Sequence, residues 1–69
     1  MTGLFALRDA TLAARAVDPY IGTCAKQGMF TIVRAVPRKG RSHDVTELSA
    51  PMPGWQAIEW LRKFADNAN

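Results

Sequence analysis

Cysteine and histidine are nearly absent from this chain, since Cys24 and His43 are the only residues of their types. A single cysteine excludes a disulfide bond within the chain. A four-ligand zinc site would need carboxylates to complete its ligand set, and the sequence has no metal-ligand spacing of the usual kinds. We therefore expect no cofactor and no metal, which leaves side-chain packing or association with another chain to stabilise the fold.

The chain also lacks a long apolar run and the features of a secretory leader. No apolar stretch approaches the roughly 20 residues that span a bilayer, and no basic residues precede the short apolar segment that follows Met1. Together with the lone thiol, this pattern favours a reducing cytoplasm and no membrane partner. With 69 residues, 48 % of them hydrophobic, we expect a single folded domain, residues 1–69, with a small core.

Signals for catalysis are poor. His43 is the one imidazole available as a general base, and Ser42 and Asp44 on either side of it would point to the opposite face of a strand. Three consecutive residues therefore do not form a catalytic triad, which needs side chains that converge. Cys24 is best interpreted as a small buried hydrophobic residue, and no glycine-rich phosphate loop is present. We expect the protein not to be an enzyme.

A helix is predicted near the start of the chain, over residues 4–17, which are rich in Ala and Leu. At about 100° per residue, one side of this helix collects Ala6, Leu7, Ala10, Ala13, Ala14 and Val17. A second apolar strip of Phe5, Leu12 and Ala16 makes the helix more apolar than a surface helix requires. This strip either makes a second core contact or forms a dimer face, and we expect a dimer in solution. Pro19 ends the helix at Asp18.

The strongest helical pattern runs from Gly54 or Trp55 to about Asn67. Its apolar side carries Ala57, Ile58, Trp60, Leu61, Phe64, Ala65 and Ala68, whereas Trp55 falls at the centre of the polar side. The segment before it, residues 50–53, contains two prolines and is expected to be an extended linker.

The centre of the chain is predicted to be a β-hairpin. Residues 29–36 have the best strand pattern, residues 38–42 form a loop around Gly40, and a further strand runs from about His43 to Ser49. Arg34 falls on the same face as the apolar residues of its strand, so it either extends to an edge or points into a functional groove.

The segment from Tyr20 to Gln27 has two interpretations. It is either a short helix that begins at Pro19 and closes at Gly28, or a strand over residues 20–25. We favour the strand because two strands alone are marginally stable. The predicted fold class is α+β: an N-terminal helix, a two- or three-stranded antiparallel sheet with a basic hairpin, and a C-terminal amphipathic helix across one face. The predicted core is Ile58, Leu61, Phe64, Ile32 and Phe30, supported by Ala57 and Ala65.

Charged residues, by contrast, are present, and the basic and acidic ones are segregated along the chain. Between Pro19 and His43 there is no Asp or Glu, and five basic residues lie there: Lys26, Arg34, Arg38, Lys39 and Arg41. The segment before is neutral and the segment after is acidic. These five residues are the candidate nucleic-acid-binding site, with Lys26 next to the others if residues 20–25 form the neighbouring strand. The pattern predicts a non-enzymatic binding protein with an anionic partner, nucleic acid first.

The alternative function is binding of a protein partner, as a regulator, inhibitor or adaptor. Trp55 on the polar side of the last helix, with Met52 in the linker nearby, resembles an interface anchor. The competing interpretation is that Trp55 folds back onto the linker or the sheet. A homodimer would belong to the same class of function.

Overall fold

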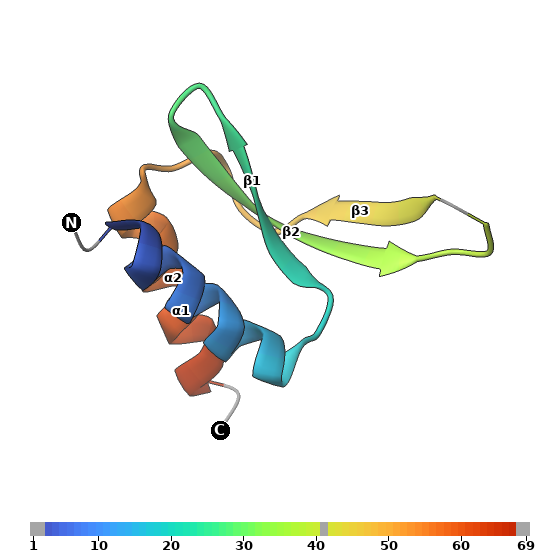
Figure 1. Cartoon of the computed structure of the whole chain (residues 1–69), viewed down its shortest axis with the longest axis horizontal. Helices are drawn as coiled ribbons and strands as arrows, with labels where there is room; N and C mark the ends of the chain where they lie inside the picture. The colour runs from blue at the N-terminus through green and yellow to red at the C-terminus, as the bar shows by residue number, and fades with distance from the viewer. Residues whose placement is uncertain (1–2, 41, 68–69) are drawn as a thin grey trace.

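The computed structural model describes residues 3–40 and 42–67 and has the order α, β, β, β, α (Figure 1). The elements are α1 (Gly3–Val17), β1 (Ile21–Lys26), β2 (Met29–Pro37), β3 (His43–Glu47) and α2 (Gly54–Asn67). Arg41 and Ala68 lie outside the described residues, as does the side chain of Phe5. The predicted α+β class, with a helix at each end of the chain, is confirmed.

The three strands form one antiparallel sheet in the order β1-β2-β3. Lys26 pairs with Met29, so the turn between β1 and β2 has only two residues, Gln27 and Gly28. Both have positive φ angles, 53° and 76°, which is the backbone of a type I′ hairpin turn. This geometry confirms the strand interpretation for β1 and rules out the short helix.

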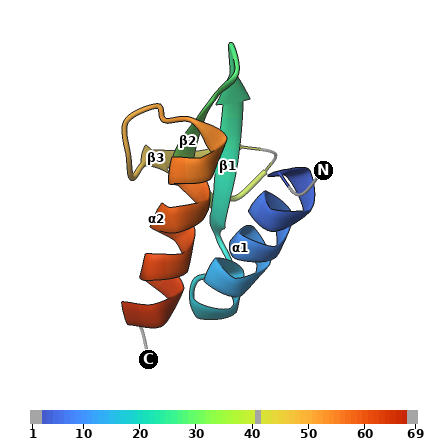
Figure 2. The same ribbon diagram turned by 90° about the vertical axis from the view of Figure 1, so that its left-hand side faces the viewer.

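The two helices lie side by side on one face of the sheet (Figure 2). Helix α1 lies next to β1 and α2 lies against β2. Between them lie the seven residues that are buried in the described part of the chain: Ala10, Ala14, Ile21, Ile32, Met52, Ala57 and Leu61. The alanines of α1 and α2 let the two helices approach closely, which is how so few large side chains can fill the space between the layers.

The predicted core is confirmed in its centre and incomplete at its edge. Leu61, Ile32 and Ala57 are fully buried, whereas Phe30, Ile58 and Phe64 are half-buried and pack against the core from outside. Ala65 is also half-buried.

Two core residues come from segments that the sequence analysis did not assign to the core, Ile21 at the start of β1 and Met52 in the linker. Met52 forms an isolated bridge to Phe30. In this bridge the N–H of Phe30 donates to the carbonyl of Met52 at 2.7 Å, and the N–H of Met52 donates back at 2.9 Å. The linker is therefore fastened to the sheet along β2, and its methionine closes the core.

The helices cover only part of the sheet. The N–H of Ala35 donates to the carbonyl of Tyr20, and beyond this bond β2 has a neighbour on one side only, β3. From there the two strands continue away from the helices (Figure 1), and all five residues of β3 are exposed. No helix in the described part of the chain is both long and apolar enough to cross a membrane.

Candidate nucleic-acid interface

The most prominent surface feature is the outer end of the β2–β3 hairpin, residues 36–44, which we call the basic arm. Pro37 and His43 are its last paired residues, and the N–H of Arg38 donates to the carbonyl of Ser42 at 3.0 Å to close the loop. Gly40 has a φ of 95°, which other residues adopt only with strain. Pro37 is tolerated at the end of β2 because its nitrogen faces the side on which β1 has already ended.

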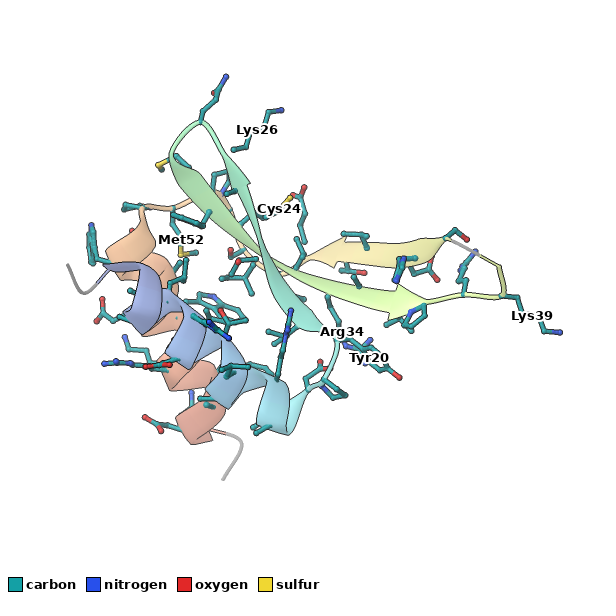
Figure 3. All side chains as sticks on the ribbon, viewed as in Figure 1. Tyr20, Cys24, Lys26, Arg34, Lys39 and Met52 are labelled. Carbon is teal, nitrogen blue, oxygen red and sulfur yellow. The ribbon has the colours of Figure 1, made fainter. Side chains whose placement is uncertain are left out.

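Two of the predicted site residues lie together at the tip of the basic arm. Lys39 extends from the turn into solvent (Figure 3). Arg38 donates from Nε to Asp44 Oδ2 at 2.5 Å, across the hairpin, with its side chain 64 % exposed. This ion pair braces the arm and partly neutralises Arg38, but it leaves most of the guanidinium open to a phosphate. Arg41 lies in the same loop of the sequence, outside the described residues.

Arg34 is placed differently, at the base of the hairpin. Its Nε donates to Asp18 Oδ2 at 2.7 Å, and its guanidinium lies 5.5 Å from the ring centroid of Tyr20 (Figure 3). The hydrogen bond from Arg34, together with one from the N–H of Tyr20, holds the pKa of Asp18 below its usual range. The structure gives Arg34 a role that the sequence analysis did not predict, since it ties the α1–β1 connection to β2.

Lys26 does not join the other basic residues. It pairs with Met29 at one end of β2, whereas Pro37 and the basic arm lie at the other end. Eight residue steps along β2 separate the two ends by roughly 26 Å, and Figure 3 shows Lys26 and Lys39 at opposite extremes of the sheet. The expectation that Lys26 would lie next to the other basic residues is therefore wrong. Strand β1 does pair with β2, but Lys26 lies at the end of β1 that is farthest from the arm.

Of the two residues of the predicted partner interface, only Trp55 is exposed. Its side chain is 67 % exposed, so it does not fold back onto the linker. Met52 is 6 % exposed and belongs to the core, which removes it from any partner surface. Further along α2, the ring centroids of Trp60 and Phe64 lie 5.7 Å apart in a stacked pair, and both side chains are half-buried against the core. Trp55, Trp60, Phe64 and Lys63 form what we call the aromatic face of α2.

The two residues considered for chemistry are both at the surface. Cys24 is exposed, contrary to the expectation of a buried thiol, because it points to the face of the sheet that the helices leave open. His43 is exposed at the start of β3. Among the described residues no group of three or more His, Cys, Asp or Glu side chains could hold a metal ion.

Sequence reasoning missed the residue that braces the arm, Asp44. An acid six positions after an arginine is a signal for such a pair once the hairpin register is known, because the register sets Val36 opposite Asp44, close to Arg38. It also missed Val45, a β-branched residue that is 60 % exposed on β3.

Comparison of the chain with protein-family models, with curated proteins and with solved structures finds no match.

Proposed function

We propose that this chain is a non-enzymatic nucleic-acid-binding protein that contacts phosphates through the basic arm. The observation that supports this proposal is the position of Arg38 and Lys39 at the tip of a hairpin that extends beyond the helices. A two-stranded hairpin is narrow enough to lie along or within the major groove, which is about 12 Å wide. Each contact of a basic side chain with a phosphate releases counterions and favours binding.

The roles of the basic residues differ in this proposal. Lys39 and Arg41 contact phosphates directly, and Arg38 does so while it remains hydrogen-bonded to Asp44. Arg34 keeps the base of the arm in place through Asp18, and Lys26 takes no part. Because phosphate contacts carry no base information, we expect weak dependence on sequence. An exposed, unpaired thiol at Cys24 suits a reducing compartment, so we place this activity in the cytoplasm.

The experiment that tests the proposal compares two triple variants with the same net charge. The arm variant carries Arg38→Ala, Lys39→Ala and Arg41→Ala, and the control carries Arg8→Ala, Arg62→Ala and Lys63→Ala on the helices. Binding to duplex DNA is measured as a function of salt concentration. The wild type should show a log–log slope of about −0.9 for each phosphate contacted, and the arm variant should lose up to about three contacts from that slope.

The control variant should lower affinity only slightly and keep the slope of the wild type, since its charges lie away from the arm. Equal losses in both variants would mean that net charge, rather than the arm, attracts the nucleic acid. Absence of binding by the wild type to duplex DNA, single-stranded DNA and RNA at low salt would reject the proposal.

A second candidate function, binding of a protein partner, is favoured by the exposure of Trp55 on the aromatic face of α2. Tryptophan is enriched among the residues that dominate binding energy. In this case Trp55→Ala would abolish partner binding and leave helix content unchanged, while the arm variant would bind normally. Trp55→Ala and the arm variant, compared with the wild type, therefore separate the two functions.

A further inference from the structure

We propose that two copies of this chain associate through the free edge of β3, which joins their sheets into one antiparallel sheet with three strands from each copy. The interface is the exposed edge of β3, and the proposed occupant is the β3 strand of a second copy. The proposal concerns β3 itself and does not depend on nucleic-acid binding by the turn of the arm.

The backbone of β3 is set up for pairing on its free side. The N–H of Leu48 donates to the carbonyl of Ile32 at 2.8 Å, and the N–H of Arg38 donates to the carbonyl of Ser42 at 3.0 Å. In an antiparallel ladder, residues alternate between facing the neighbouring strand and facing away. The alternation directs the N–H and C=O groups of Asp44 and Thr46 toward β2, and those of His43, Val45 and Glu47 toward the free edge.

The side chains of β3 are self-complementary in one register. When two β3 strands run antiparallel around a twofold axis at Val45, this residue faces its own copy. His43 then faces the partner's Glu47, and Asp44 faces the partner's Thr46. An imidazole opposite a carboxylate is a favourable cross-strand pair, and the symmetry supplies it twice. In this register the outward-facing backbone groups of both strands meet, so each supplies donors and acceptors for the other.

The two neighbouring registers that keep the same backbone hydrogen bonding give less favourable cross-strand side-chain pairs. A shift in one direction places Asp44 opposite the partner's Asp44, and like charges directly opposite are unfavourable. A shift in the other direction places Val45 opposite the partner's Glu47. Self-complementarity in a single register points to a second copy of this chain rather than to an unrelated strand.

Two features of the arm explain why it would gain from such a partner. Beyond Ala35 the sheet has only two strands and no helix beneath them, and a two-stranded hairpin is marginally stable in water. Val45 is 60 % exposed in the middle of an edge strand, where natural proteins usually place charge or proline to prevent pairing. Pairing would bring the two Val45 side chains together on the open face of the sheet, next to Ala35 of each copy.

The test is the mass of the full chain in solution, measured by sedimentation equilibrium across micromolar concentrations. The wild type should approach twice its 7.6 kDa chain mass. Val45→Pro removes an N–H that only the partner would use, so it should yield a monomer with the thermal melt retained. Val45→Thr keeps both the N–H and the branched shape, and as the matched control it should still dimerise.

Charge variants test the register and do not depend on proline. Glu47→Lys should raise the dissociation constant of the dimer by about tenfold, because two favourable pairs become repulsive or are lost. The double variant His43→Glu with Glu47→Lys should restore dimerisation, since it re-creates the pair with the signs exchanged.

A wild type that stays monomeric across this concentration range would overturn the proposal. So would a dimer that both Val45→Pro and Glu47→Lys leave intact, and loss of that dimer in Leu12→Lys would then place the interface on α1. Nucleic-acid binding is measured separately on the monomeric variant, so the failure of one proposal does not imply the failure of the other.

Discussion

The helix-covered part of the molecule and the basic arm differ in how they are held together. Around α1, α2 and the paired region of β1 and β2, the seven buried residues among those described form a continuous core. In the arm, by contrast, the described structure depends on backbone pairing, the ion pair of Arg38 with Asp44 and a glycine turn. A chain of this size has few apolar residues to bury, and it concentrates them at one end. We therefore expect the exposed end to contribute little to folding, which would leave it available for the proposed recognition of nucleic acid.

The largest effect on stability is expected from truncation of a side chain in the core. Leu61→Ala should lower the free energy of unfolding by about 2–5 kcal/mol, because Leu61 is fully buried between the helices and the sheet. Val45→Ala, on the exposed strand β3, should cost less than about 1 kcal/mol. Denaturant melts in dilute solution measure both, and equal losses would mean that the arm carries more of the stability than its exposure indicates.

Two glycines provide a matched comparison of the turns. Gly28 and Gly40 both have positive φ angles, 76° and 95°, and a Cβ added at either would meet no atom within 4 Å. Alanine therefore introduces only backbone strain, about 1 kcal/mol in each turn.

Gly28→Ala should lower the melting temperature, because the β1–β2 turn sets the register in which β1, with the buried Ile21 at its far end, pairs with β2. Gly40→Ala should instead speed hydrogen exchange in the arm and leave the melting temperature nearly unchanged. If Gly40→Ala destabilised the whole molecule as much as Gly28→Ala, the arm and the core would unfold as one unit.

The junction between the two regions should respond to acid. The hydrogen bonds from Arg34 and from the N–H of Tyr20 lower the pKa of Asp18 in the folded state. A carboxyl whose pKa is lowered by folding stabilises the fold at pH values above its pKa in the unfolded chain. This contribution is lost as pH falls through the pKa in the folded state.

Asp18→Asn should therefore be less stable than the wild type near neutral pH, and the difference should shrink as pH falls below about 4 and disappear once pH is below the folded pKa of Asp18. Stability curves of the two proteins against pH measure this, with Glu59→Gln on α2 as the control. A difference that persists unchanged into strong acid would show that Asp18 acts through something other than its charge.

The smallest expected effect concerns the ion pair in the arm. Asp44→Asn releases Arg38 from its partner and should tighten duplex binding by a few-fold. The log–log salt dependence should become steeper by about one phosphate contact. Folding should stay within about 0.5 kcal/mol of the wild type because the pair is exposed. Weaker binding in this variant would mean that the brace, rather than the free charge of Arg38, is what the nucleic acid requires.

Much of the fold could be predicted from the sequence, for physical reasons that are local. The period of α2 predicted Leu61 and Ala57 as buried, and the strand pattern of β2 predicted Ile32. Met52 was assigned to a partner surface because adjacent prolines suggest a free linker, whereas its backbone pairs with Phe30, 22 residues away. A contact between segments so distant in the chain leaves no local signal.

The candidate site was predicted in part. Arg38 and Lys39 lie in a hairpin tip, as their position between two strand patterns indicated, but Lys26 lies at the opposite end of β2. Basic residues that are close in the sequence are not close in space here, because the two ends of a nine-residue strand lie far apart. The exposure of Cys24 depends on which face of the sheet the helices cover, and the sequence of β1 does not indicate that.

We propose that the basic arm recognises nucleic acid and that the core supplies the stability of the fold. The most direct test is a titration of the isotope-labelled wild-type chain with short duplex DNA, followed by amide chemical shifts at each residue. We expect the largest shifts between Arg38 and Asp44, with residues of α2 unchanged. Shifts centred on Trp55 and the aromatic face of α2, with the arm unaffected, would contradict it.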